Sequence, residues 1–186
     1  MAGLSVEIDK YVPCLIRNSD KAVVRTFVSE ASDADLRGYN SRTGWCVNWQ
    51  KDMRIDKLTG RPIRRYKLLV EDNDEIQGLL GLVEPEEPGE PLSVSWAVAN
   101  PNSQSRVVGV GNKEYIGIGG HLFAVACEKS KELGLDGEWV GFARNSDLDR
   151  YYVEKVGLDD LGGGRVAMSR EKAEEIMSIY NYEWTE

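Results

Sequence analysis

Three glycines close together give this sequence its clearest chemical signal. Gly117, Gly119 and Gly120 lie within residues 114–122, between a predicted strand and a predicted amphipathic helix. The first amides of a helix have no intrahelical acceptor and the helix dipole adds positive potential, so a helix N-terminus binds anions. Glycines lack the Cβ atoms that would hold a pyrophosphate away from the backbone. The stretch therefore predicts a phosphate-binding loop.

Two common glycine motifs do not fit this loop. The dinucleotide pattern GxGxxG requires a glycine at position 122, where the chain has Leu122, and it should follow the first strand of a fold. The phosphate-loop pattern GxxxxGK[ST] is absent from the sequence. What remains is x-x-G-x-G-G-x-L at the start of a helix that comes late in the chain.

In this context the loop, written EYIGIGGHL, resembles the coenzyme A-binding motif of the GNAT acetyltransferase superfamily, Arg/Gln-x-x-Gly-x-Gly/Ala. The surrounding order also matches: the strand LSVSWAVA, the loop, a helix, the strand WVGFA, and then residues 145–158, which are similar to the family's N-x-x-A-x-x-x-Y-x-K-x-G-F. The resemblance covers residues 66–168 well, and the N-terminal third matches in element order only. A narrower resemblance is to small uncharacterised bacterial GNAT proteins with a GIGGHL-type loop.

The resemblance implies an N-acetyltransferase, an acyl-CoA-dependent enzyme that uses acetyl-CoA as cosubstrate and no metal. An amine acceptor, either a small molecule or a protein, would attack the thioester directly in a ternary complex. The alternative is a catalytically silent GNAT-fold module that binds coenzyme A or regulates a partner. The residues expected at the cofactor are Ala97, Val98, Ala99, Ile116, Gly117, Ile118, Gly119, Gly120, His121, Leu122, Asn145 and Tyr152.

Two departures from the family pattern bear on activity. The usual Arg or Gln is Glu114 here, which suits a pyrophosphate only if it turns outward, and Lys113 beside it could supply the positive charge. The family's tyrosine falls on Tyr152 when counted from Asn145, but one residue later when counted back from the glycine at 157. A local one-residue insertion would reconcile the counts on Tyr152, with Tyr151 as the other candidate.

Each candidate site residue also has a structural interpretation. Tyr152 is the candidate general acid for the leaving thiolate, or a tyrosine packed in the core. Glu84 is the candidate base, or an exposed loop glutamate. Asn145 contacts the cofactor or caps a helix. Trp45 and Trp96 line the acceptor site or belong to the core.

The elements that must position these residues follow from hydrophobic periodicity and from turn residues. They form a mixed α/β domain with a mostly antiparallel sheet, a parallel βαβ unit and flanking helices, the GNAT fold. One domain spans residues 1–186. Strands are predicted over 4–8, 66–70, 76–83, 92–99, 139–143 and 165–168, and helices over 19–36, 118–133, 147–156 and 170–180.

Composition limits the other classes of function. The chain carries 23 basic and 31 acidic residues, a formal charge of −8, which disfavours nucleic-acid binding and tolerates a cationic amine. A local basic cluster at 54–67 keeps open a GNAT toxin that acetylates charged transfer RNA. Three scattered cysteines, no secretory signal and no apolar run of membrane-spanning length favour a cytoplasmic protein without a membrane partner. A homodimer is left open.

Overall fold

The structure, a computed structural model, describes residues 3–9 and 12–186. Its strands are β1 (Gly3–Ser5), β2 (Leu15–Arg17), β3 (Val23–Val24), β4 (Thr26–Glu30), β5 (Arg64–Val70), β6 (Asn73–Val83), β7 (Leu92–Ala99), β8 (Tyr115–Ile116), β9 (Trp139–Phe142), β10 (Asp159–Gly162), β11 (Arg165–Met168) and β12 (Glu183–Trp184). Its α-helices are α1 (Ser105–Val108), α2 (Ile118–Glu132), α3 (Ser146–Tyr151) and α4 (Arg170–Ile179). A π-helical turn, Tyr152–Val156, continues α3.

A mixed sheet forms the centre of the molecule. Within the described residues its strand order is β10-β11-β9-β7-β6-β5-β4-β12, and β1 pairs with β7 outside that path. Neighbours from β4 to β7 are antiparallel, whereas β7 and β9 are parallel and are connected through α2. The predicted mixed α/β sheet with one parallel βαβ unit is therefore confirmed. Strands β3, β2 and β8 form a smaller sheet beside it.

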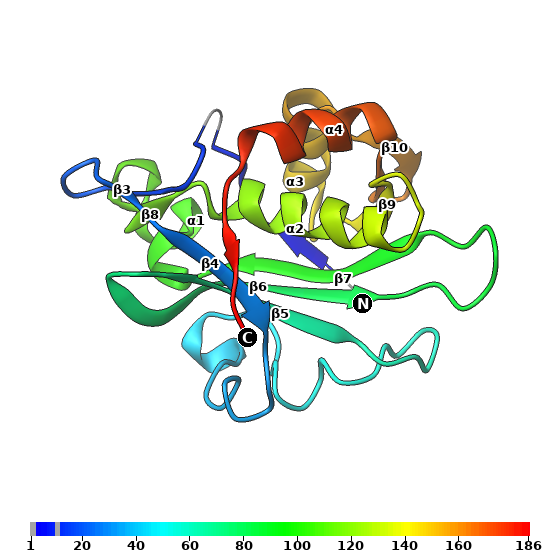
Figure 1. Cartoon of the computed structure of the whole chain (residues 1–186), viewed down its shortest axis with the longest axis horizontal. Coiled ribbons are helices and arrows are strands. Elements are labelled where there is room, and N and C mark those ends of the chain that lie inside the picture. Colours follow the sequence, from blue (N-terminus) through cyan, green and yellow to red (C-terminus); the bar gives the residue numbers. More distant parts are fainter. Residues whose placement is uncertain (1–2, 10–11) are drawn as a thin grey trace.

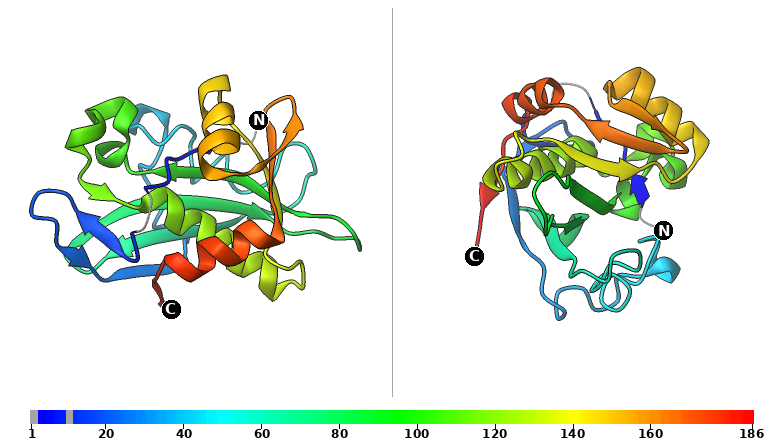
Figure 2. Two further views of the ribbon diagram at one scale, coloured as in Figure 1. Left: turned by 90° about the horizontal axis from the view of Figure 1, so that it is seen from above. Right: turned by 90° about the vertical axis from the view of Figure 1, so that its right-hand side faces the viewer.

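Both faces of the central sheet are covered. Helices α2, α3 and α4 lie over one face, and the segment between β4 and β5 lies over the other (Figures 1 and 2). This explains why the predicted strand LSVSWAVA is apolar on both sides: from Val94 to Ala99 every residue of β7 is buried. A first hydrophobic cluster, which includes Leu4, Phe123 and Tyr152, fills the side of α2. A second one, built around Trp49, fills the other side.

The helix predicted over residues 19–36 is wrong. Strands β3 and β4 and a turn-rich stretch lie there instead. The segment contains a run of β-branched and aromatic residues, which prefer extended backbone: Val23, Val24, Thr26, Phe27 and Val28. This preference outweighs the apparent helix cap at the start of the segment. The strand predicted over 4–8 is shorter than expected, since β1 ends at residue 5.

Candidate functional site

Strands β7 and β9 separate within the sheet. Their parallel ladder joins Leu92–Val94 to Trp139–Gly141. The next residue of β7, Ser95, is extra in the ladder with β6, because Gly81 pairs with Trp96 and Leu82 pairs with Val94. Such a bulge bends its strand. Beyond it, β7 leaves β9, and we call the space between the two strands the opening.

The N-terminal strand fills this opening. Leu4 of β1 pairs with Ala97 of β7, and it also bridges to Ala143 just after β9. The carbonyl of Leu4 accepts a hydrogen bond from the amide of Arg144 at 3.2 Å. Leu4 is fully buried and Val6 is 2% exposed. Residues 3–9, called the N-terminal segment below, thus run between the two strands toward α2.

The glycine loop meets the N-terminal segment where the opening ends. Gly117 precedes α2 with a φ of 101°, a left-handed conformation that favours glycine. Its amide donates a hydrogen bond of 3.0 Å to the carboxylate of Asp9. A Cβ atom on Gly119 would collide with the carbonyl oxygen of Glu7. The loop therefore receives both a carboxylate and a closely approaching chain.

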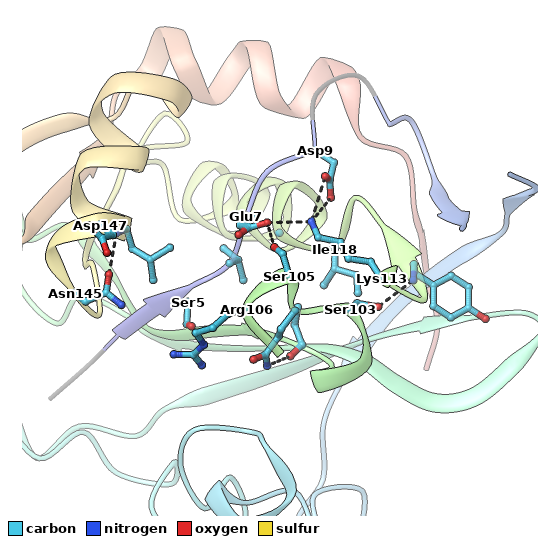
Figure 3. Close-up of a pocket in the computed structure, with 16 residues that line it drawn as sticks. Ser5, Glu7, Asp9, Ser103, Ser105, Arg106, Lys113, Ile118, Asn145 and Asp147 are labelled. Atoms are coloured by element: carbon cyan, nitrogen blue, oxygen red, sulfur yellow. Dashed lines mark hydrogen bonds and ion pairs between the residues drawn. The ribbon is translucent and has the colours of Figure 1, made fainter. Parts of the chain in front are cut away.

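Lys113 supplies a buried positive charge beside the loop. Its ammonium lies 3.1 Å from Glu7 and 3.3 Å from Asp9, and its side chain is 6% exposed. Burial alone would lower the pKa of Lys113, but the charges of Asp9 and Glu7 outweigh it and raise the pKa. Ser105 donates a hydrogen bond to the same Glu7 carboxylate. Figure 3 shows Glu7 and Asp9 turned toward Lys113 from the N-terminal segment.

Two consecutive tyrosines hold the backbone of the N-terminal segment. The hydroxyl of Tyr152 donates to the carbonyl of Val6 at 2.8 Å and accepts from its amide at 3.0 Å. Tyr151 makes the same two bonds to Ile8, each 2.9 Å long. Tyr152 is fully buried, and burial raises its pKa, so its phenol keeps its proton at neutral pH. Both candidate tyrosines therefore reach the opening.

A π-helical turn begins at the second of the two tyrosines. A π turn contains one residue more than an α-helical turn. It starts at Tyr152, directly after α3, and ends before Gly157. The turn lies between Tyr152 and the glycine at 157, the stretch in which a local one-residue insertion would reconcile the two motif counts.

A pocket of about 210 Å³ remains beside the N-terminal segment. Ala99, Ile118, Gly119 and Asn145 line it, and all four are among the predicted cofactor residues. Asn145 also caps α3, since its side chain accepts a hydrogen bond from the amide of Leu148 at 2.9 Å. The pocket wall further includes Glu7, Asp9, Ser105, Arg106, Lys113 and Asp147.

The other predicted cofactor residues lie deeper. Ala97 and Val98 are fully buried and pair with β1. Gly120 faces Tyr180, whose ring a Cβ atom there would strike, and Leu122 is 2% exposed in the first hydrophobic cluster. Ile116 lies in β8, where it pairs with Ile16 of β2.

The predicted catalytic base and acceptor residues are dispersed. Glu84 follows β6 at the far end of β7 from Ala99, and its carboxylate accepts a hydrogen bond of 2.8 Å from Arg64. Trp45 is 4% exposed and lies in the second hydrophobic cluster. Trp96 is also in that cluster, but its ring packs on Gly3, where a Cβ atom would lie 2.7 Å away. Trp96 therefore reaches the end of the opening remote from the glycine loop.

Glu114 turns away from the glycine loop. Its carboxylate accepts a hydrogen bond of 3.3 Å from Asn73 of β6. Lys113, by contrast, is buried against the loop. The substitution of an acid at this motif position is thus compatible with an anion at the loop.

Sequence reasoning missed Glu7, Asp9 and Ser105 as site residues. Glu7 alternates with Val6 and Ile8 and therefore reads as the polar side of a short strand. Nothing in the local pattern indicates that this side faces a loop more than one hundred residues later in the chain. A possible signal was opposite charge: Glu7 and Asp9 are acidic, and Lys113 beside the glycine motif is basic.

His121 is buried in the first turn of α2. Its two ring nitrogens lie 2.6 Å from the carbonyl of Gly117 and 3.2 Å from that of Asn181. Burial lowers its pKa, and the hydrogen bonds to Gly117, Asn181 and Pro13 oppose the shift only in part. The ring is therefore neutral in the folded protein at neutral pH and packs against Tyr180.

Acid should destabilise the protein through this histidine. The pKa of His121 in the folded state lies below 6.5. Below pH 6.5 the histidine of the unfolded chain therefore binds a proton more readily than the histidine of the folded chain. The stabilising contribution is present above pH 6.5 and is lost as the pH falls, by up to about 1.4 kcal/mol per pH unit. Urea unfolding of wild type and His121→Gln between pH 7.5 and 5 should show the smaller pH slope in the variant. Because the chain has one histidine, equal slopes would contradict this assignment.

Two other kinds of site are absent from the described residues. Across 3–9 and 12–186, no group of three or more His, Cys, Asp or Glu side chains is arranged to hold a metal ion. None of the helices in that part of the chain has the length and apolarity needed to cross a membrane.

Comparison of the chain with models of known protein families, with curated proteins and with solved structures found no match.

Proposed function

We propose that this chain is an acyl-CoA-dependent N-acyltransferase of the GNAT type, which transfers an acetyl group from acetyl-CoA to an amine. The observation that carries the proposal is the opening between β7 and β9, which leads directly to the glycine N-terminus of α2. An extended chain already lies in this opening with a carboxylate at the loop. An extended apolar chain with a negative charge at the loop is also the form that a pantetheine arm ending in a pyrophosphate would present, which supports the proposal.

The arrangement of strands supports a GNAT fold. The order β4-β5-β6-β7-β9, antiparallel except at the last pair, agrees with the element order of the resemblance. The bulge at Ser95 lies where β7 leaves β9, and the GNAT resemblance implies such a separation of the central strand from its neighbour. The strand order and the bulge are independent of the glycine and tyrosine motifs, so they add separate support to the proposal.

Each part of the opening has a proposed role in binding. Backbone groups of residues 97–99 hold the amides of the pantetheine arm. The amides at Gly117–Gly119 hold the pyrophosphate, with Lys113 as the nearby cation. Gly119 must stay without a side chain because the N-terminal segment passes against it, and the pantetheine arm would follow the same path.

The chemical step requires a proton donor for the thiolate and an acceptor for the proton of the amine. The amine nitrogen bonds to the thioester carbonyl carbon, and the carbon–sulfur bond breaks. Tyr152 gives its proton to the departing thiolate, and the proton that the amine loses goes to solvent or to a carboxylate such as Glu84. Burial raises the pKa of Tyr152, so the phenol holds its proton at neutral pH but gives it up less readily than an exposed phenol would.

The acceptor would approach from the face opposite α2. A pocket of about 200 Å³ lies there, lined by Ser95, Trp96 and Met53. Trp96 reaches the thioester end of the opening, and the acidic character of the chain suits an amine cation. This makes Trp96 the better supported of the two predicted acceptor residues.

One observation favours the silent-module alternative. Both hydrogen bonds of the Tyr152 hydroxyl are made to Val6, so the phenol is engaged inside the chain. A protein that keeps this arrangement would not transfer an acetyl group. Transfer RNA as the acceptor has less support, because five of the six cations in the basic cluster pair with carboxylates: Arg54, Arg61, Arg64, Arg65 and Lys67.

Titration calorimetry with acetyl-CoA tests the proposal. The wild type should bind, and Gly119→Trp should reduce binding below detection because the indole fills the path of the ligand. Gly111→Trp is the matched control, since nothing lies within 4 Å of a Cβ atom there, and it should bind as the wild type does. An amine panel with detection of the released thiol then separates an enzyme from a silent module.

A further inference from the structure

We propose that the N-terminal segment, residues 3–9, is a built-in competitor of acyl-CoA, which occupies the cofactor site and must leave before the cofactor enters. The inference rests on the proposed function and adds a regulatory step to the same site. It is argued from three sets of contacts: those of the strand, those of the charges and those of the tyrosines.

The strand contacts use the surface assigned to pantetheine. Gly3, Leu4 and Ser5 pair in parallel with Trp96, Ala97 and Val98 along the free edge of β7. Those backbone groups cannot hold a second extended ligand while β1 is present. Leu4 and Val6 fill the apolar part of the opening.

The charge contacts reproduce those of a pyrophosphate. Asp9 accepts the amide of Gly117, and Asp9 and Glu7 together surround the Lys113 ammonium. Two negative carboxylates at a helix N-terminus next to a buried cation match the charge that a diphosphate brings. The segment is therefore arranged as an extended apolar arm that ends in paired negative charge.

The tyrosine contacts connect the presence of the N-terminal segment in the opening to proton transfer by Tyr152. While Tyr152 donates to the carbonyl of Val6, its proton is not available to a thiolate. Departure of the segment would release this hydroxyl into the opening at the place that Val6 now occupies, next to Gly119. The same movement would free the hydroxyl of Tyr151 from Ile8.

The other strand pairings of the central sheet do not run through the segment. Strand β1 lies off the path that connects β10 to β12, so all other strand pairings can persist without it. In the proposed opening the segment leaves as a unit, and the equilibrium is treated as two-state. The apparent dissociation constant for acetyl-CoA then equals the intrinsic constant divided by the open fraction, so a segment that is open 1% of the time weakens binding about 100-fold.

A reversible lock tests the opening directly. Ser5 and Val98 are register partners in a parallel ladder, a spacing that a disulfide can bridge. In the Ser5→Cys/Val98→Cys variant, oxidation should weaken acetyl-CoA binding at least about tenfold, and reduction should restore it. The wild type, treated with the same oxidant, controls for Cys14, Cys46 and Cys127.

A loosened segment tests the inference from the other direction. Leu4→Ala should lower the apparent dissociation constant at least about fivefold, because it favours the open state without changing any charge. Leu68→Ala removes an equally buried leucine from β5, away from the opening, and should leave the constant unchanged. Hydrogen exchange supplies a second readout: acetyl-CoA should speed exchange in residues 3–9 and slow it at 117–122.

The outcomes separate the two claims. Equal acetyl-CoA affinity in the locked and the reduced protein, or in Leu4→Ala and wild type, overturns the competitor and leaves the acyltransferase proposal standing. Absence of binding in the wild type, in the reduced variant and in Leu4→Ala overturns the acyltransferase proposal itself.

Discussion

Tyr152→Phe should lower kcat by about 100-fold or more while it tightens acetyl-CoA binding. The loss of turnover follows from removal of the proton donor for the thiolate. The tighter binding follows because the phenylalanine leaves the amide and the carbonyl of Val6 without their partners, which destabilises the segment in the opening. Steady-state kinetics with an accepted amine, together with calorimetry, measures the two effects on the same protein.

Tyr151→Phe is the matched control for that variant. It removes the equivalent two hydrogen bonds, to Ile8, one residue earlier in the helix. It should therefore tighten binding to a similar degree but keep most of kcat. If Tyr151→Phe instead loses turnover and Tyr152→Phe keeps it, Tyr151 is the general acid and the motif count from Asn145 is misleading.

Trp49→Ala should lower the free energy of unfolding by about 3–5 kcal/mol, the largest stability effect that we expect from a single substitution. Trp49 is fully buried at the centre of the second hydrophobic cluster, and its indole donates a hydrogen bond of 3.0 Å to the carbonyl of Trp45. The alanine leaves a cavity beneath β6, where Gly81 allows the indole and Met53 to approach the strand. Urea unfolding measures the loss.

Two further variants make this result interpretable. Trp184→Ala removes an indole that is 38% exposed and should cost much less. Trp49→Phe keeps most of the packing and should remain folded, so acetyl-CoA binding can be measured in it. Because the cofactor loop lies on the other face of the sheet, that binding should match the wild type, whereas a loss would connect the second cluster to the cofactor site.

Local patterns predicted the central βαβ unit well. Strand β7 has the bounds expected for it, and α2 ends one residue before the predicted end. These elements are specified by short-range periodicity and by glycines at defined turns, which a single sequence displays. The N-terminal third was predicted poorly, because an apparent helix cap there competed with a run of β-branched residues.

The sequence by itself determined a glycine loop at a helix N-terminus, a lysine beside it and two consecutive tyrosines in a later helix. Only the tertiary structure decided what these features face. Val6 and Tyr152 are 146 residues apart in the chain, and Asp9 and Lys113 are 104 apart. The alternation around Leu4 predicts a strand but not its partner, since any free sheet edge could accept it. The bulge at Ser95 and the separation of β7 from β9 create that free edge inside the sheet, and so place the N-terminal segment in the candidate cofactor site.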